Sequence, residues 1–425
     1  MAAYFKQFFK KLGPGLTTGA ADDDPSGIAT YSQTGAQFGY GQLWTALFML
    51  PLIIAVQEAC ARVGAVNGEG VAAVIKKNYS SKILYVIVML LLVANTINIG
   101  ADIGAMAAAL HLLVPVNFAV LTLLFTAVIL ILEIFIQYRR YANILKWLCL
   151  SLIAYPLTVF IIDVPWATVM KATFVPHIQF DFQFLFIITG VLGTTISPYL
   201  FIWQASQEVE EEKDKGLIKE SGKPHISKQY IRNLRIDTCV GMIFSEIATW
   251  SIIVVGAAVL HTNGITTINS AADAAKALEP LVHGFPAAGF LTKLIFCIGI
   301  IGLGMLSVPV LAGSTAYAMS EAFSWKKGLS LKLRDAHGFY GVITIATVIG
   351  LCINFVGIDP FRALVYAAVI NGVIAVPMIF IIALVARNEK IMGKYKSGWL
   401  SNTFVWLTFI CMSVAAIAMF FSFSH

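Results

Sequence analysis

Apolar stretches about as long as a lipid bilayer is thick follow one another along almost the whole of this chain. A transmembrane helix needs roughly 20 consecutive apolar residues. Eleven windows of this kind occur, at 14–35, 42–64, 80–111, 117–137, 144–163, 184–206, 234–260, 288–318, 338–357, 361–386 and 400–423. Of the 425 residues, 58% are hydrophobic and only 12% are charged. Because no water-soluble domain of this length can bury so much apolar surface, the sequence predicts an all-α integral membrane protein, with 1–425 as a single transmembrane domain.

Basic residues are distributed very unevenly between the loops on the two sides of these windows. With the N-terminus inside the cell, 25 of the 29 Lys and Arg residues fall in cytoplasmic stretches. The exceptions are Lys171, Lys276, Lys293 and Arg362. The positive-inside rule therefore predicts eleven spans, with the N-terminus inside and the C-terminus outside. Since the net charge of +6 arises mostly in these loops, we expect no nucleic-acid partner.

The first apolar window is interrupted by the stretch "DDDPSG", residues 22–27. A charged side chain at the centre of a membrane costs roughly 3 kcal/mol or more and usually has a function. Asp22, Asp23 and Asp24 lie too far inside the window to cap a helix at the lipid–water surface. Pro25 and Gly27 add a helix-breaking signal. We therefore expect a broken first helix with carboxylates at membrane depth.

The sixth window contains a second interruption, "GTTISPYL", residues 193–200. Pro198 removes a backbone donor and clashes with the preceding turn, and nearby Ser and Thr hydroxyls can satisfy the carbonyls that this frees. A simple kink is the alternative for this window alone. Because windows one and six are five apart, however, they cross the membrane in opposite directions. Two such breaks are typical of an inverted-repeat transporter whose site lies where the breaks meet.

This interpretation divides the chain into a five-helix repeat at about 14–163, an inverted repeat at about 184–386, and an extra helix at about 400–423. At the paired breaks, Asp24 offers a carboxylate, while Thr194 and Ser197 offer hydroxyl or carbonyl oxygens that can face the first helix. A set of oxygen donors suits hard cations such as Mg²⁺, Mn²⁺ or Ca²⁺. A proton relay and a sodium-coupled solute site remain alternatives.

Several motifs resemble those of the natural resistance-associated macrophage protein (Nramp) family. "DPSG" resembles the Asp-Pro-Gly-Asn motif of that family's first helix, and "GTTISPY" resembles its helix-6 "GATVMPH". "CARVGAVNGEG" and "ADIGAMAAAL" resemble its "SARLGVVTGKD" and "AEVIGTAIAL". The resemblance covers essentially the whole chain in order. It implies a leucine-transporter-type 5+5 fold with broken helices 1 and 6, and divalent metal transport by alternating access.

The departures from the family pattern are as informative as the matches. The motif asparagine, a metal ligand in the family, falls on Gly27, and the helix-6 methionine falls on Ser197. Loss of the soft thioether argues against a preference for iron or cadmium. The pattern is similar to the Nramp-related magnesium transporter branch, which implies Mg²⁺ and Mn²⁺ as substrates. Mg²⁺ usually keeps several waters when bound, and a larger, more polar site suits a hydrated ion.

The family's proton machinery is also incomplete in this chain. Its two helix-6 histidines fall on Tyr199 and Gln204, and its helix-3 aspartate falls on Ile99, while the acidic neighbour one turn on is kept as Asp102. An unperturbed tyrosine titrates near pH 10, too high for a proton shuttle at neutral pH. We therefore expect voltage-driven uptake without proton coupling. The alternative is a proton-coupled Mn²⁺/Fe²⁺ importer of the ordinary Nramp kind.

Other polar residues lie within or next to the spans. We expect Asp102 to face the aqueous cavity and attract cations, with a buried structural hydrogen bond as the alternative. Asp22 and Asp23 would either widen the negative field or bond free backbone amides. Asn371 would either reach the site from span 10 or serve helix packing. Glu58 and Glu246 are expected to pair with polar groups near the cytoplasmic side. The acidic run "EVEEEKD" is interpreted as a solvated face.

Two other functions are less compatible with the sequence. An intramembrane aspartyl protease needs two aspartates on separate helices, which Asp24 and Asp102 would nominally supply, but helix 6 carries no acid before Glu208. A channel is disfavoured because no re-entrant filter is visible. We expect a transporter rather than an enzyme, with no cofactor and with Mg²⁺ or Mn²⁺ as the transported substrate. It would work as a monomer in the lipid bilayer of a bacterial cytoplasmic membrane.

Overall fold

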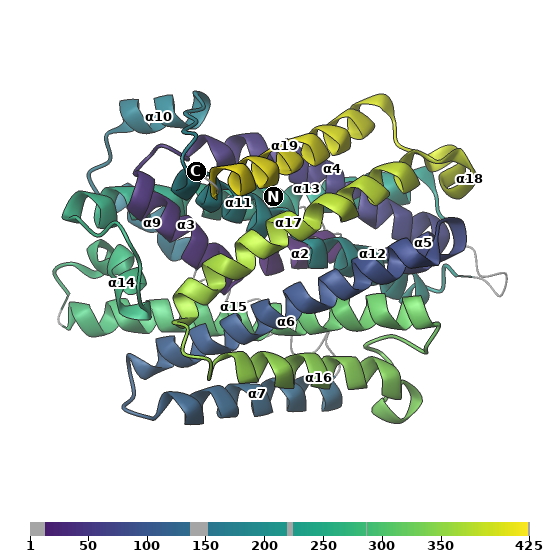
Figure 1. Cartoon of the computed structure of the whole chain (residues 1–425), viewed down its shortest axis with the longest axis horizontal. Helices are drawn as coiled ribbons and strands as arrows, with labels where there is room; N and C mark the ends of the chain where they lie inside the picture. Colours follow the sequence, from purple (N-terminus) through teal and green to yellow (C-terminus); the bar gives the residue numbers. More distant parts are fainter. Residues whose placement is uncertain (1–12, 137–151, 219–223, 286, 424–425) are drawn as a thin grey trace, which may run out of the picture.

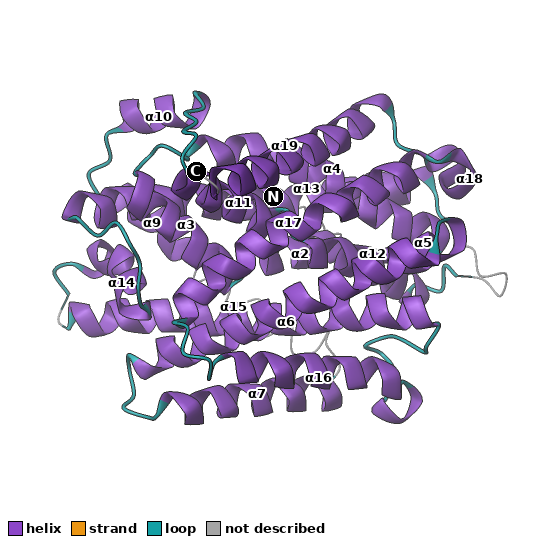
Figure 2. Cartoon of the chain, viewed as in Figure 1, coloured by secondary structure: helices purple, strands orange, loops and turns teal. Residues whose placement is uncertain are grey.

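The structure is a computed structural model that describes residues 13–136, 152–218, 224–285 and 287–423. Throughout these ranges the regular secondary structure is helical, apart from one isolated bridge between Ile218 and Pro224 (Figure 2). This confirms the all-α prediction for the described part of the chain.

The helices follow the predicted windows closely. The first half of the chain contains α2 (Pro14–Asp22), α3 (Pro25–Phe38), α4 (Trp44–Asn67), α5 (Val71–Asn78), α6 (Ser81–His111), α7 (Phe118–Phe135), α9 (Ala154–Ile161) and α10 (Trp166–Phe174). The second half contains α11 (Phe182–Thr195), α12 (Pro198–Asp214), α13 (Lys228–Val255), α14 (Ala271–Ala275), α15 (Ala288–Phe323), α16 (His337–Ile353), α17 (Pro360–Arg387), α18 (Glu389–Met392) and α19 (Trp399–Phe423). We refer to α2 with α3 as helix 1, and to α11 with α12 as helix 6.

Eight helical segments among the described residues are long and apolar enough to cross a membrane, with Phe182–Asp214 counted as one segment. Helix 1 is divided into two short pieces, and α16 is shorter than the eight at 17 residues. Part of the fifth predicted window, 144–151, lies outside the described residues. The number of eleven spans and the 5+5 repeat therefore remain predictions.

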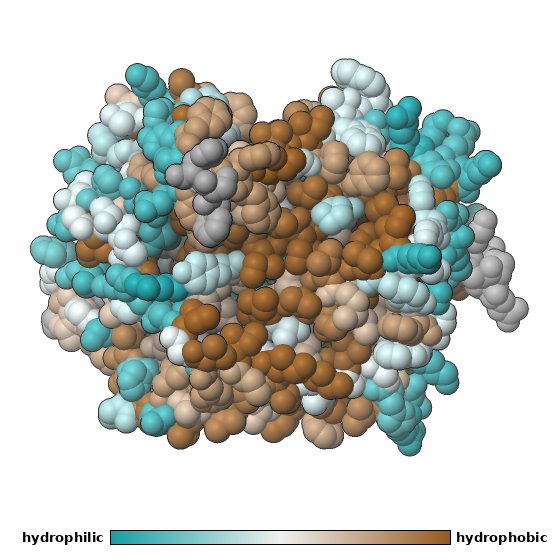
Figure 3. All heavy atoms as spheres, in the orientation of Figure 1, coloured by the Kyte–Doolittle hydropathy of each residue, from teal (hydrophilic) through white to brown (hydrophobic). Residues whose placement is uncertain are grey.

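The outer surface agrees with a membrane setting. Figure 3 shows hydrophobic side chains as a band across the middle of the molecule, with hydrophilic side chains gathered at its two ends. Large apolar residues of the membrane-length helices are more than half exposed, among them Leu123, Ile131, Phe244 and Ile410. Such a continuous apolar surface is stable only against lipid or another apolar partner.

Helices 1 and 6 lie in the interior of the molecule. In Figure 1 their four pieces lie near the centre, and α6, α15, α16 and α7 pack against one another below them. Glycines permit this close packing. A side chain on Gly193 of α11 would collide with the backbone of Gly372 in α17, and one on Gly19 of α2 would collide with Gly241 in α13.

The first half of helix 1 is fastened to α13 at its N-terminal end. The carboxylate of Asp237 in α13 accepts hydrogen bonds from the backbone N–H groups of Gly13, at 2.9 Å, and Gly15, at 2.7 Å. Carboxylates at helix N-termini satisfy the free N–H groups and complement the helix dipole. The position of α2 is therefore set by α13 as well as by its connection to α3.

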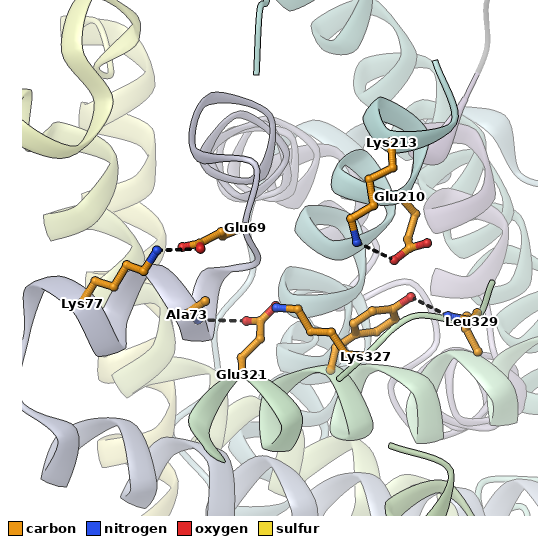
Figure 4. A network of polar contacts seen from close by, with 9 residues as sticks. Glu69, Ala73, Lys77, Glu210, Lys213, Glu321, Lys327 and Leu329 are labelled. Carbon is orange, nitrogen blue, oxygen red and sulfur yellow. Dashed lines mark hydrogen bonds and ion pairs between the residues drawn. The ribbon is translucent and has the colours of Figure 1, made fainter. Parts of the chain in front are cut away.

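The end of the molecule that carries α5 holds a network of paired charges (Figure 4). Glu321, near the end of α15, accepts hydrogen bonds from the backbone N–H of Ala73 at 2.9 Å and from Lys327 at 2.5 Å. Lys77 and Glu69 form a second pair at 2.6 Å. These contacts connect the short helix α5 to the end of α15 and to the loop that follows it.

Candidate functional site

The break in helix 1 is built by Asp24 and the proline that follows it. The α-helical conformation is disfavoured immediately before a proline, and Asp24 is extended (φ −69°, ψ 174°). Its carboxylate Oδ1 accepts the backbone N–H of Gly27 at 2.8 Å and thereby caps α3, while Pro25 occupies the first turn. Asp24 therefore caps a helix, but this helix begins in the interior of the molecule and not at the lipid–water surface.

The break in helix 6 also has an extended residue before a proline, but its side chain bonds to the preceding helix and does not cap the following one. Ser197 is extended (φ −82°, ψ 135°) before Pro198, where α12 begins. Its hydroxyl donates to the carbonyls of Gly193, at 2.7 Å, and Thr194, at 2.6 Å, which are groups at the end of α11. The Ser197 hydroxyl proton therefore satisfies carbonyls of its own helix, and the role of Ser197 as a metal ligand stays a prediction.

The two breaks meet. Ser26 and Thr194 hydroxyls lie 3.1 Å apart, and the Tyr199 hydroxyl donates to the carbonyl of Ala21 at 3.1 Å. On the same side, a Cβ on Gly27 would lie 3.5 Å from the Thr194 hydroxyl oxygen. The structure therefore brings Asp24, Gly27, Thr194 and Tyr199 together from two segments about 170 residues apart, which is the juxtaposition expected of paired broken helices.

The Asp24 carboxylate is surrounded by neutral donors. Oδ1 also accepts from the Ser26 hydroxyl at 2.5 Å, and Oδ2 accepts from the amide of Asn98 in α6 at 3.0 Å and from the Tyr199 hydroxyl at 3.4 Å. Asp24 is only 1% exposed, and no lysine or arginine of the described residues pairs with it. A buried carboxylate without a basic partner is expensive, so this position favours either a proton or a bound cation.

Asp102 lies close to this carboxylate, near enough for the two charges to repel each other. Its Oδ2 accepts a hydrogen bond from the hydroxyl of Ser307 in α15 at 2.8 Å, while its buried Oδ1 has no partner among the described residues. The buried structural hydrogen bond, which was the alternative for Asp102, is therefore present. Its Oδ1 remains available for an ion or for the water of an ion.

Three further candidates are placed less directly. Asp23 accepts from the hydroxyl of Ser245 in α13 at 3.3 Å, and Gln204 donates to Glu208 at 3.1 Å, one turn further along α12. Asn371 is fully buried, and neither its side-chain oxygen nor its nitrogen has a partner in the described part of the chain. Its neighbour Gly372 packs closely against α11. This supports the helix-packing alternative for the part of α17 that contains Asn371.

Two expectations for acids outside the breaks are wrong. The acidic run is not a solvated face: it belongs to α12, and Glu208, Glu210 and Glu212 are buried. Glu246 lies near Asp22 and Asp23, and both its carboxylate oxygens are buried without a polar partner among the described residues. Glu58, by contrast, forms ion pairs with Arg62 and Arg235, as expected.

The sequence reading missed three neutral side chains at the site, namely Asn98, Ser26 and Ser307. Asn98 was detectable, because it precedes Asp102 by four residues and so lies on the same face of α6. Ser26 lies inside the helix-1 motif. Ser307 gave no signal, because a single serine in an apolar helix usually bonds to its own backbone.

The donors at the breaks are carboxylate, amide, hydroxyl and carbonyl oxygens, which suit a hard cation. Within the described ranges, no three His, Cys, Asp or Glu side chains converge closely enough to hold an ion by themselves. An ion at Asp24 would therefore complete its shell with hydroxyls, carbonyls and water. Since Asp24, Thr194 and Ser197 are each 1% exposed, the arrangement is closed to solvent.

A bundle of membrane-length helices with two broken helices meeting at buried acids defines the class of helical membrane transporters. Comparison with known proteins is more specific: the sequence model for "Natural resistance-associated macrophage protein-like" proteins matches residues 15–422. The chain therefore belongs to the Nramp family, as the motifs predicted.

Curated relatives support this assignment. The chain is 27% identical over 397 residues to a "Divalent metal cation transporter MntH" of Caldanaerobacter subterraneus, covering 92% of this chain and 87% of the relative. It is 26% identical over 432 residues to the MntH of Ralstonia nicotianae, covering 97% and 90%. These relatives are transporters, in agreement with the prediction of a transporter instead of an enzyme.

Solved structures show the same fold. The manganese transporter of Eremococcus coleocola, in complex with an aromatic bis-isothiourea substituted compound, aligns with a TM-score of 0.76 at 16% identity, covering 98% of this chain and 87% of that chain. Mhp1, a nucleobase-cation-symport-1 family transporter, aligns in its closed conformation with a TM-score of 0.58 at 14% identity, covering 97% and 92%.

Proposed function

We propose that this chain is a divalent metal cation transporter that carries Mn²⁺ and Mg²⁺ across the membrane by alternating access. The observation that carries the proposal is Asp24, a buried carboxylate with four neutral donors and no basic partner among the described residues, at the junction of two broken helices. Its curated relatives are named as divalent metal cation transporters, and one structural neighbour is a manganese transporter.

The ion would be held by Asp24, by oxygens at Thr194 and Ser197, and by water near Gly27 and the free oxygen of Asp102. Because this set contains no thioether, it should favour hard over soft cations. Gly27 leaves the space next to Thr194 without a side chain, which favours an ion that keeps part of its water, as Mg²⁺ does.

Uptake would be driven by the membrane potential, without proton coupling. Inward movement of a divalent cation across an inside-negative membrane is favoured by about 2.3 kcal/mol per charge per 100 mV. The helix-6 positions Tyr199 and Gln204 carry no carboxylate or imidazole, and Tyr199 donates its proton to the carbonyl of Ala21. This supports an uncoupled carrier over the proton-coupled Mn²⁺/Fe²⁺ importer.

We place the protein as a monomer in a bacterial cytoplasmic membrane. The end that carries α5 and α18 would face the cytoplasm, which puts the N-terminus inside and the C-terminus outside. The basic residues at that end, including Lys76, Lys77, Lys390, Lys394 and Lys396, support this orientation.

The test uses the purified protein in liposomes with an inside-negative potential, loaded with dyes for Mn²⁺, Mg²⁺ or pH. We expect both metals to enter at a rate that follows the potential, while the lumen acidifies no more than in protein-free liposomes. An external pH step should change the rate little. Absence of metal entry would refute the transport proposal, and metal-dependent acidification would replace it with the proton-coupled alternative.

A further inference from the structure

Three carboxylates next to the candidate site are not among the oxygens proposed above to hold its ion. Asp22 is fully buried and Asp23 is 2% exposed. Both face Ser245 of α13, whose hydroxyl lies 2.5 Å from Asp22 Oδ2 and 3.3 Å from Asp23 Oδ1. A single hydroxyl proton can serve only one of these oxygens at a time, and Asp22 Oδ1 has no partner among the described residues. This acidic pair is therefore under-satisfied.

The third carboxylate, Glu246, comes from a different element. Helix 1 and α13 run alongside each other, with Gly15 against Thr238, Gly19 against Gly241 and Gly35 against the backbone from Ile253 to Gly256. This register places the stretch of α13 that contains Ser245 and Glu246 directly opposite the break in helix 1.

Glu246 is 5% exposed, and both of its carboxylate oxygens are buried without a hydrogen-bond partner in the described ranges. It lies near enough to Asp22 and Asp23 for their charges to repel one another. One turn further along α13, the hydroxyl of Thr249 is also buried and unpartnered, although a mid-helix threonine commonly bonds to its own helix. Unsatisfied oxygens from two elements therefore face the same region.

The local charge has no basic residue to balance it. Across the described residues, neither Asp22, Asp23, Asp24 nor Glu246 forms an ion pair with a lysine or arginine. With all four acids ionised, one divalent ion at Asp24 would offset at most two of the four charges. Acids in a membrane are retained where they pair with a cation or serve an ion pathway.

We propose that Asp22, Asp23 and Glu246 form a second site for a hard divalent cation, adjacent to the site at Asp24. The donors are carboxylate and hydroxyl oxygens, as such ions require. Because no three acidic side chains converge on one point in the described part of the chain, the ion is held through its own water, which the unpartnered oxygens accept from. Binding there does not depend on Asp24 and would bridge α2 to α13.

The experiment counts Mn²⁺ ions bound to the purified full-length protein by equilibrium dialysis, with electron paramagnetic resonance of the bound ions. Wild type should bind two ions per chain, and their proximity should broaden the Mn²⁺ spectrum. Glu246→Gln and Asp22→Asn should each bind one ion with a sharper spectrum. Asp24→Ala should also bind one, and the double variant Asp24→Ala/Glu246→Gln should bind none.

Glu133→Gln is the matched control, because Glu133 is another buried carboxylate without a partner in the described residues, but it lies alone on α7. It should leave the stoichiometry at two. One ion in the wild type, or two ions in a folded Glu246→Gln or Asp22→Asn protein, would overturn the second site. Since either result can occur with Asp24-dependent transport intact, failure of this proposal is distinguishable from failure of the proposed function.

Discussion

Buried carboxylates occur in two settings in this molecule, and the settings differ in what surrounds them. Toward the end that carries α5, Glu58 accepts from Arg62 at 2.9 Å and from Arg235 at 2.7 Å, and Glu321 accepts from Lys327. At the helix breaks, the partners of Asp24 in the described part of the chain are a serine, an asparagine, a tyrosine and a backbone amide, all of them neutral donors. The paired acids belong to the framework, while the unpaired acids leave their negative charge available to an ion.

The difference follows from the free energy of burying charge. Breaking a buried ion pair by removing one partner leaves an uncompensated charge, so a paired acid is coupled to stability. An unpaired acid in the interior already lacks compensation, so removing its charge relieves a cost and affects ion binding instead. Substitutions in the two settings should therefore give opposite patterns of stability and transport.

The largest effect is expected for Asp24→Asn. The amide keeps the shape of the side chain but removes the negative charge, so Mn²⁺ uptake into liposomes should fall to background, while thermal unfolding stays at or above the wild-type temperature. Glu389→Gln, in an exposed pair with Lys396, is the control and should transport normally. Near-normal uptake by a folded Asp24→Asn protein would refute the site.

Glu58→Gln should show the reverse pattern. The Arg62 side chain is fully buried, and without the carboxylate its charge has only the Tyr395 carbonyl and the Ser397 hydroxyl as partners. We expect the free energy of unfolding to fall by about 3–5 kcal/mol, measured by thermal or denaturant unfolding in detergent. Mn²⁺ stoichiometry measured on the folded fraction should not change. A stable Glu58→Gln protein that has lost metal binding would reverse the roles assigned here.

A smaller effect is expected from changing ligand type without changing charge. Ser197→Met combined with Gly27→Asn should raise Cd²⁺ affinity relative to Mg²⁺ by about tenfold, or about 1.4 kcal/mol, because a thioether favours soft ions. The added Cβ at position 27 would lie 3.1 Å from the ring of Tyr31, so that ring must shift slightly. Titration calorimetry with both ions tests this. An unchanged ranking in a folded variant would remove helix 6 as the determinant of selectivity.

The smallest effect is expected at the exposed edge of the paired network. The Lys77 side chain is 63% exposed, and its partner Glu69 is 33% exposed. Lys77→Met should lower the free energy of unfolding by no more than about 1 kcal/mol and leave transport unchanged. A loss as large as that of Glu58→Gln would show that exposure does not separate the strong pairs from the weak ones in this network.

The positions of both breaks could be predicted from the sequence, because Pro25 and Pro198 exclude the helical conformation from the residues before them. The partners of the acids could not be predicted as well. Hydropathy gives the depth of a residue in the membrane, but it does not give the rotation of its helix. The sequence gives the same expectation for Glu58 and Glu246, yet Glu58 pairs with two arginines and Glu246 lies near Asp22 and Asp23.

The burial of the acidic run "EVEEEKD" could not be predicted for a related reason. A charged run next to an apolar window is usually solvated, and composition alone cannot show that α12 continues past the window and is covered by other segments. Glu208 accepts from Tyr230 of α13, and Glu210 accepts from Ser330 in the loop after α15. The partners in these two contacts are separated by 22 and by 120 positions in the sequence, so no local pattern could have revealed them.

The attachment of α2 to α13 has a mechanical consequence. Two hydrogen bonds to the Asp237 carboxylate and the glycine contacts at Gly15 and Gly19 bind α2 to α13, whereas the two non-helical residues of the break, Asp23 and Asp24, connect α2 to α3. A tilt of α2 about Asp23 and Asp24 would therefore carry with it the part of α13 that contains Asp237 and Gly241, while the part from Ile253 onward stays packed against Gly35 of α3. Spin labels on α2 and on the former part of α13 should then keep their separation when metal is added, while labels on α2 and α3 change theirs. An ion bound at Asp24 would lie at the pivot of this tilt, where a small displacement of the break produces a large movement at the far end of α2.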